Sequence, residues 1–123
     1  MRLTPEEYVR QNFLHRLVEE FHYPAALIAV EQTLEPITSD TAHRLRADAV
    51  VYNRQLQPRM LLEFKADTVA LSQRTLDQIA VYNRLMHVPY LVLHNGHQTV
   101  VAQVEEKVIT FMDQLPAWTT LSN

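Results

Sequence analysis

Three ionisable residues occur inside two segments that otherwise have the composition of buried strands. Asp48 directly precedes the apolar run Ala-Val-Val-Tyr, and Glu63 and Lys65 lie two residues apart in the next such segment. Because side chains alternate along a strand, Glu63 and Lys65 share one face and the intervening Phe64 points to the other. An unpaired buried charge is costly, so these groups must pair, bind a metal or lie at an exposed edge of the sheet.

Two carboxylates on adjacent strands would form an all-oxygen site suited to Mg²⁺ or Mn²⁺. A cation bound there would polarise a phosphate group and lower the pKa of a bound water molecule. Lys65 would orient that water or stabilise the negative charge that develops on phosphorus. The backbone carbonyl of Phe64 is a further candidate ligand. The alternative is an ion pair of Lys65 with Asp48 or Glu63 at a strand end.

The elements that must hold these residues alternate between helix and strand patterns. The segment Thr4-Pro5-Glu6-Glu7 has the form of a helix start with a capping box. The apolar spacing that follows predicts a helix to about Phe21, with one apolar face made of Leu14, Leu17, Val18 and Phe21. A second helix is predicted over Leu71–His87. Strands are predicted over Leu27–Glu31, Arg46–Asn53, Arg59–Ala66, Tyr90–His94, Thr99–Val104 and Val108–Met112.

The order of these elements predicts an α/β domain with a mixed β-sheet flanked by helices. The first three strands are expected to run antiparallel, and the second helix should connect two parallel strands. Asn95-Gly96 predicts a hairpin turn, with His94 and His97 in solvent beside it. None of the six histidines has the spacing of a zinc ligand. We expect a single domain over residues 1–123.

Composition removes several classes of functional site. The 123 residues include no Cys, which excludes disulfide scaffolds, thiolate nucleophiles and Cys-bound metals and leaves hard, oxygen-bound cations. A single Gly excludes the Gly-rich phosphate loops. No apolar run approaches the length of a membrane span and no signal peptide is visible, so we expect a cytoplasmic protein with no membrane partner. The net charge of −3 argues against a strongly basic nucleic-acid binder.

The chemistry-bearing residues resemble the PD-(D/E)xK nuclease superfamily. Asp48 followed by Glu63-Phe-Lys65 matches its signature, with Ala47 in place of the proline, and Gln78-Ile-Ala-Val-Tyr82 matches the Q-x-x-x-Y motif of some branches. The resemblance is closer still to the N-terminal nuclease domain of type I restriction enzyme R subunits. It extends from Thr4 to about Met112 through the segments TPEEYVRQNFL, RADAVVYN, LEFKA, DQIAVYN and VPYLVLHNG.

This resemblance implies a restriction-endonuclease-like fold and a metal-dependent DNA endonuclease. It implies that Asp48 and Glu63 hold Mg²⁺ or Mn²⁺, and that Lys65 activates water or stabilises charge. It also implies that Gln78 belongs to the catalytic set and that Gln78 and Tyr82 face DNA or order the site.

Further assignments accompany the resemblance, and simpler alternatives exist for Glu6, Arg10 and Gln78. Some members of the superfamily use a first-helix glutamate at the metal site, which makes Glu6 a candidate ligand. Arg10 and Arg46 are candidates for DNA contact. The alternative for Glu6 and Arg10 is an ordinary i,i+4 pair. The alternative for Gln78, which shares the apolar face of its helix, is a hydrogen-bonded core glutamine.

Type I R subunits join this domain to a helicase motor, which 123 residues cannot contain. The implied partners are therefore DNA together with a motor or specificity subunit, or a second copy of the chain. The competing hypothesis is a catalytically silent, nuclease-like module that binds nucleic acid or a partner subunit. It is motivated by the missing motor and by the acidic net charge.

Overall fold

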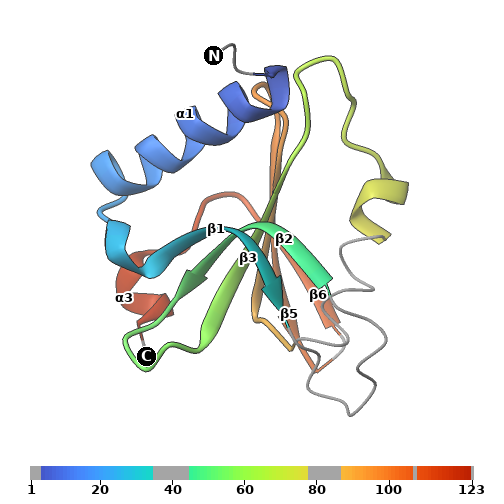
Figure 1. Cartoon of the computed structure of the whole chain (residues 1–123). Helices are drawn as coiled ribbons and strands as arrows, with labels where there is room; N and C mark the ends of the chain where they lie inside the picture. Colours follow the sequence, from blue (N-terminus) through green and yellow to red (C-terminus); the bar gives the residue numbers. More distant parts are fainter. Residues whose placement is uncertain (1–3, 35–44, 78–86, 107, 123) are drawn as a thin grey trace.

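A mixed sheet of six strands forms the centre of the protein (Figure 1). A computed structural model describes residues 4–34, 45–77, 87–106 and 108–122. Residues 73–77 begin the predicted second helix, of which residues 78–86 lie outside the described part of the chain. The helical elements are α1 (Pro5–Glu19), the 3₁₀ turn η1 (Ala25–Leu27) and α3 (Trp118–Leu121). The strands are β1 (Ile28–Leu34), β2 (Leu45–Tyr52), β3 (Pro58–Phe64), β4 (Tyr90–His94), β5 (Thr99–Glu105) and β6 (Val108–Met112).

The strands lie in the sheet in their sequence order, from β1 at one edge to β6 at the other. Strands β1, β2 and β3 run antiparallel, β3 and β4 run parallel, and β4, β5 and β6 again run antiparallel. In the parallel pair Met60 lies beside Tyr90 and Phe64 beside His94. The predicted mixed sheet, with three antiparallel strands followed by a parallel pair, is therefore confirmed.

Helix α1 begins where the capping pattern predicted. The Thr4 hydroxyl accepts a hydrogen bond from the Glu7 N–H at 3.1 Å, and Pro5 occupies the first helical position, where no N–H is needed. The helix ends at Glu19, earlier than predicted. The Phe21 N–H still bonds the Arg16 carbonyl, so the chain continues to curl beyond the last helical residue.

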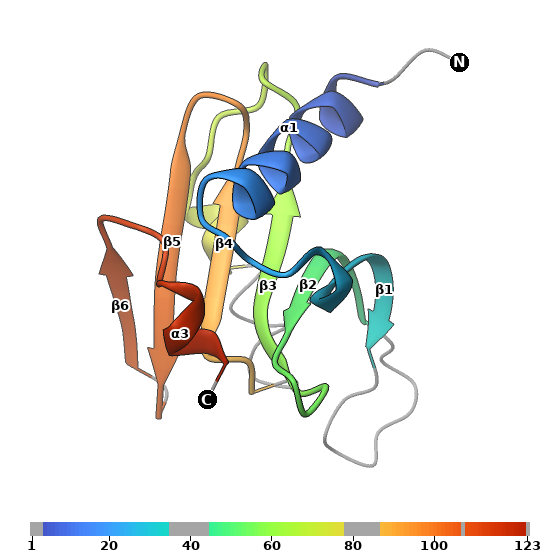
Figure 2. The same cartoon turned by 90° about the vertical axis from the view of Figure 1, so that its left-hand side faces the viewer.

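The buried face of α1 consists of Val9, Phe13 and Leu17. Of the face expected from the sequence, Leu17 is fully buried, while Leu14 and Phe21 pack only at its margin. Figure 2 shows α1 crossing one face of the sheet, with α3 on the same side. This apolar layer also contains side chains from β2 and β3, namely Ala49, Val51, Met60, Leu62 and Phe64.

The opposite face of the sheet is covered by the segment that opens the second helix. Leu71 and Leu76 pack there against a second apolar cluster. That cluster includes Val50, Leu61, Leu91 and Leu93. Strand β4 is buried along its whole length because it lies between the two layers, as expected for a central strand of a parallel pair.

Asn95 and Gly96 form the predicted turn between β4 and β5. Gly96 has a φ of +95°, which favours glycine. The Asn95 side-chain oxygen accepts hydrogen bonds from the N–H groups of His97 (2.9 Å) and Gln98 (2.7 Å). His97 is exposed, as predicted.

The expectation that His94 is solvated is wrong. Only 7% of His94 is exposed, because its ring packs 4.5 Å from that of Phe13 and its Nδ1 hydrogen-bonds the Thr99 hydroxyl at 2.7 Å. Burial lowers the pKa of His94. Helix α1 packs on the end of β4 and covers this histidine, and the turn motif alone gives no sign of that packing.

Candidate functional site

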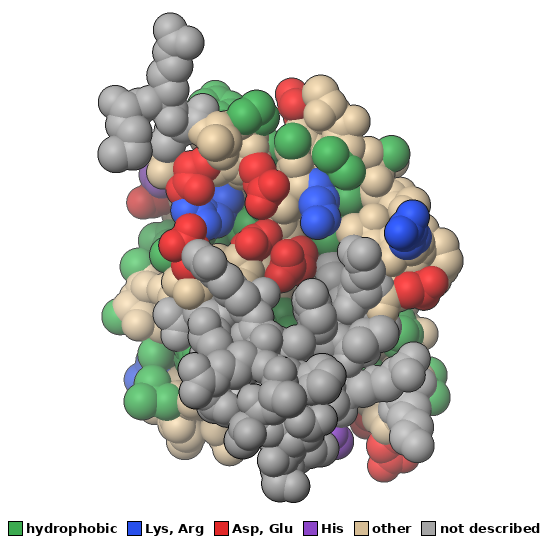
Figure 3. Space-filling view, turned by 45° about the vertical axis from the view of Figure 1, so that its right-hand side comes forward, with side chains coloured by type: hydrophobic (Ala, Val, Ile, Leu, Met, Phe, Trp, Pro, Cys, Tyr) green, Lys and Arg blue, Asp and Glu red, His purple; other side chains and the backbone are tan. Residues whose placement is uncertain are grey.

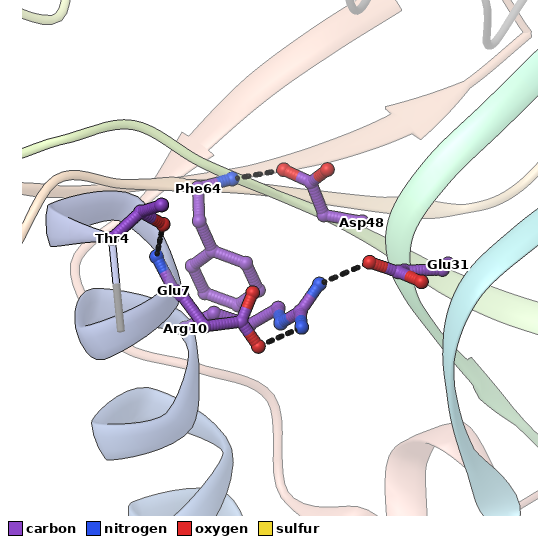
Figure 4. A network of polar contacts seen from close by, with 6 residues as sticks. All are labelled: Thr4, Glu7, Arg10, Glu31, Asp48 and Phe64. Atoms are coloured by element: carbon purple, nitrogen blue, oxygen red, sulfur yellow. Dashed lines mark hydrogen bonds and ion pairs between the residues drawn. The ribbon is translucent and has the colours of Figure 1, made fainter. Parts of the chain in front are cut away.

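Asp48 and Glu63 lie where strands β2 and β3 stop pairing. The regular pairs of these strands run from the turn to Ala49 beside Leu62, and Asp48 and Glu63 are the next residue on each strand. Beyond this pair the Asp48 carboxylate takes the place of a backbone acceptor, because its Oδ2 accepts the Phe64 N–H at 2.8 Å (Figure 4). The Asp48 side chain therefore fills the gap at which the two strands separate.

Phe64 anchors the end of β3 in the core. Its side chain is 1% exposed and its ring centroid lies 5.6 Å from that of Phe13 on α1. Glu63 and Lys65, on either side of it, are half-buried. An apolar residue locked in the core thus fixes the positions of the two ionisable residues that flank it.

The carboxyl groups of Asp48 and Glu63 converge, and this changes the protonation of Glu63. Burial raises the pKa of Glu63 to about 8, and the charge of Asp48 and a hydrogen bond with its side chain act in the same direction. A backbone hydrogen bond at Asp48 and the Lys65 ammonium act in the opposite direction, to a smaller extent. At neutral pH and without a bound cation, Glu63 therefore keeps its proton, which it shares in a hydrogen bond with the Asp48 side chain.

Lys65 extends the parallel pairing beyond Phe64. Its backbone N–H donates to the His94 carbonyl at 2.9 Å, which fixes the backbone next to Glu63. Within the described residues its side chain makes no ion pair with Asp48 or Glu63. The simple alternative of a strand-end ion pair is therefore not what this geometry shows.

A polar hollow of about 510 Å³ lies beside Asp48. Figure 3 shows acidic side chains gathered next to basic ones on one part of the surface. Arg10 of α1 forms ion pairs there with Glu7 and, at 3.2 Å, with Glu31 of β1 (Figure 4). The hollow is lined by residues from the start of α1, from β1 and β2 and from the segment after β3, namely Thr4, Pro5, Glu6, Glu7, Arg10, Glu31, Asp48 and Ala66.

The hollow also places Glu6 and Arg10. Glu6 lines it together with Asp48, and its role as a metal ligand stays a prediction. The alternative of an i,i+4 pair between Glu6 and Arg10 is not what the structure shows, because Arg10 binds Glu7 and Glu31. Burial lowers the pKa of Arg10, but the hydrogen bonds and charges of Glu31 and Glu7 outweigh this and leave its pKa raised.

Glu31 is the residue that sequence reasoning missed. On either side of it, Val30 pairs with Ala49 and Gln32 with Ala47, which puts Glu31 opposite Asp48 across the β1–β2 pair. Its φ is +53°, a left-handed conformation that is unusual for a glutamate inside a strand. A charged residue in an apolar strand was the available signal, but its backbone conformation and its contact with α1 arise only from the tertiary fold.

Several predicted site residues lie outside what the structure describes. These are Gln78 and Tyr82, together with the side chain of Arg46. Within the described ranges, no three His, Cys, Asp or Glu side chains lie close enough to hold a metal ion together. The Asp48–Glu63 pair therefore offers two carboxylates, and the predicted Mg²⁺ or Mn²⁺ site stays a prediction.

None of the helices in the described ranges is long and apolar enough to cross a bilayer.

Comparisons with known proteins agree with this architecture. The family model of the type I restriction enzyme R protein N terminus matches residues 5–116. A solved structure described as a fragment of an HsdR subunit of a type I restriction enzyme from Vibrio vulnificus YJ016 superposes with a TM-score of 0.69 at 18% sequence identity. The match covers 98% of this chain and 25% of that one. No curated protein shows significant similarity to the chain. Because the family model spans most of its length, the chain belongs to the family of type I restriction enzyme R protein N-terminal domains.

Proposed function

We propose that this domain hydrolyses DNA phosphodiester bonds with the help of a divalent cation held by Asp48 and Glu63. The observation that carries the proposal is the convergence of these two carboxyl groups at the point where β2 and β3 separate. Lys65, two residues beyond Glu63, supplies a positive charge beside them. Membership of a restriction enzyme family adds support, since such enzymes cut DNA.

The donor set fits Mg²⁺ or Mn²⁺. Two crowded carboxyl groups, with the pKa of Glu63 raised to about 8, carry a charge repulsion that a divalent cation would relieve. Carboxylate oxygens, with the Phe64 carbonyl as a third ligand, are the donors that these hard cations prefer. When bound, such a cation would polarise the scissile phosphate and lower the pKa of a water molecule.

The chain's own residues would share the remaining work. The Phe64 N–H orients the Asp48 carboxylate through its bond to Oδ2. The Lys65 ammonium would stabilise negative charge that develops on phosphate, and its backbone is held by the bond to His94. Gln78 and Tyr82 would contact DNA or order the site, as the family motif implies.

We further propose that the domain works inside a larger assembly. The chain spans about a quarter of the HsdR fragment that it resembles, 25% by alignment. We infer that DNA is brought to the site by a motor or specificity subunit, or by a second copy of the chain, in the cytoplasm. This arrangement would also offset the net charge of −3, which disfavours DNA binding by the domain alone.

The first test is metal-dependent cleavage. Purified wild-type protein should nick supercoiled plasmid in Mg²⁺ or Mn²⁺, and Asp48→Asn or Glu63→Gln should abolish nicking. Asp113→Asn, which removes an exposed carboxylate outside the site, is the matched control and should cut like the wild type. Chelation of the metal with EDTA should stop cleavage by both active proteins.

One observation favours a second candidate, the catalytically silent binding module. The hollow beside Asp48 carries several glutamates against a single arginine, and this negative potential repels phosphate. The wild-type protein could bind DNA or a partner subunit in a gel-shift assay and yet neither cleave plasmid nor bind Mn²⁺ in a direct titration. In that case the nuclease proposal fails and the binding module is the better description.

A further inference from the structure

Arg10 occupies a position that an ordinary surface arginine does not. Its side chain is 14% exposed, and its two terminal nitrogens reach carboxylates on different elements, Glu7 on α1 and Glu31 on β1. Arg16, on the same helix, offers a contrast, because it pairs with Glu20 one turn away and both side chains are more than half exposed. Arg10 therefore bridges α1 and β1 across the hollow that contains Asp48.

The partner on β1 is held for this contact. Glu31 has a left-handed backbone inside a strand and lies opposite Asp48. Such backbone conformations persist where the surroundings fix them and gather at functional sites. A guanidinium is planar, cannot lose its proton and presents two donors to two carboxylates at once. Arg10 thus places a permanent positive charge between the two glutamates.

We propose that Arg10 is a positioning residue that serves as the resident cation of the hollow, so that the domain holds one divalent cation, at Asp48 and Glu63, and not two. This rests on the proposed function. Glu7 and Glu31 are neutralised in part by Arg10, and a second dication near them would meet its repulsion. Within the described residues, Asp48 and Glu63 make no ion pair with an arginine, so no resident positive charge competes with a cation there.

The experiment is a titration of the intact chain with Mn²⁺, in which binding is measured by calorimetry and by the EPR signal of free Mn²⁺. Wild-type protein should bind one Mn²⁺, and Asp48→Asn should weaken that binding by about tenfold or more. Arg10→Gln removes the charge and should add a second Mn²⁺. Arg10→Lys keeps the charge, and Arg16→Gln removes a charge elsewhere on α1, so both should bind one.

Glu31→Gln gives a readout that does not depend on the folding of an Arg10 variant. Because Glu31 is engaged by Arg10, the substitution should change the affinity of the single Mn²⁺ by less than about fivefold, the scale of one partly exposed ion pair. A larger loss would make Glu31 a metal ligand and overturn the inference.

The remaining outcomes separate the two proposals. Two Mn²⁺ ions bound by the wild type, or an Arg10→Gln protein that is folded by circular dichroism and still binds only one, would refute the role of Arg10 and leave the nuclease proposal standing. A wild-type protein that binds no Mn²⁺, or binds it equally well after Asp48→Asn, would remove both.

Discussion

Replacing Glu63 by Gln should make the metal-free protein more stable at alkaline pH. Burial and the neighbouring Asp48 raise the pKa of Glu63 from its ordinary value of 4.5 to about 8. Between these two values the folded protein keeps a proton that the unfolded chain has lost. The stability that depends on this proton is therefore complete below about pH 4.5 and falls as pH rises through about 8. Gln is neutral at every pH and can still donate a hydrogen bond to Asp48.

The size of the effect follows from the shift. One bound proton changes the free energy of unfolding by about 1.4 kcal/mol per pH unit, so the wild type should lose about 3 to 5 kcal/mol between about pH 5 and about pH 9 through this group. Titrating groups that do not contact Glu63, His94 among them, contribute equally to both proteins. They cancel when the wild type and Glu63→Gln are compared at each pH.

The assay is urea unfolding in the presence of EDTA at several pH values across this range. We expect the stability advantage of Glu63→Gln over the wild type to grow steadily from acid to alkaline pH. Glu19→Gln removes an exposed carboxylate at the end of α1 and is the control that should track the wild type. Adding Mg²⁺ at about pH 8 should stabilise the wild type and leave Glu63→Gln unchanged, since a ligand stabilises only the state that binds it.

A constant difference between the two proteins across the pH range would refute this reasoning. It would mean that Glu63 ionises in the folded protein as it does in the unfolded chain, so that the carboxyl groups of Asp48 and Glu63 are neither crowded nor buried. A growing difference that Mg²⁺ fails to reverse would confirm the crowded pair and count against its role as a cation site.

Three further predictions concern the scaffold, and each is measured by urea unfolding. Leu17→Ala should cost about 2 to 5 kcal/mol because Leu17 is fully buried, whereas Leu56→Ala, at a position that is 70% exposed, should stay within about 0.5 kcal/mol. Gly96→Ala should cost about 1 kcal/mol or more, since the φ is +95° and the new Cβ would lie 3.3 Å from a methyl group of Val9; an unchanged midpoint would contradict this. Asn53→Ala should cost about 1 to 3 kcal/mol, because the fully buried Asn53 side chain accepts two backbone N–H groups of the β2–β3 turn, and hydrogen exchange should accelerate there.

The sheet could be predicted because its strands carry local signals. Tyr90–His94 and Val108–Met112 match the observed strands residue for residue, since each is an apolar, β-branched or aromatic run bounded by turn residues. The start of α1 could likewise be predicted from Thr4 and Pro5. The buried face of α1 could not be predicted, because Val9 and Phe13 form one apolar stripe and Leu14 and Phe21 contribute to another. The packing angle of the helix on the sheet decides which stripe is buried.

The site divides in the same way. The pairing of Asp48 with Glu63 followed from two neighbouring strands with a short connection, which is information within the sequence. The contact of Arg10 with Glu31 could not be predicted in this way. It depends on where α1 lies relative to β1 and on a left-handed backbone conformation at Glu31 that the residue type does not indicate. The burial of His94 under Phe13 has the same origin.

The sequence order of the strands has a consequence for how the domain folds. Strands β1 to β3 and strands β4 to β6 are two meanders of local pairings, and the parallel seam between β3 and β4 is the pairing that joins them. Loop closure across the intervening helix makes that seam the slow, non-local step. Asp48, Glu63 and Glu31 all belong to the first meander, so the acidic half of the site can assemble before the seam closes. The bond from Lys65 to His94 is made by the seam itself, and the lysine's backbone is therefore fixed only when the two halves of the chain have met.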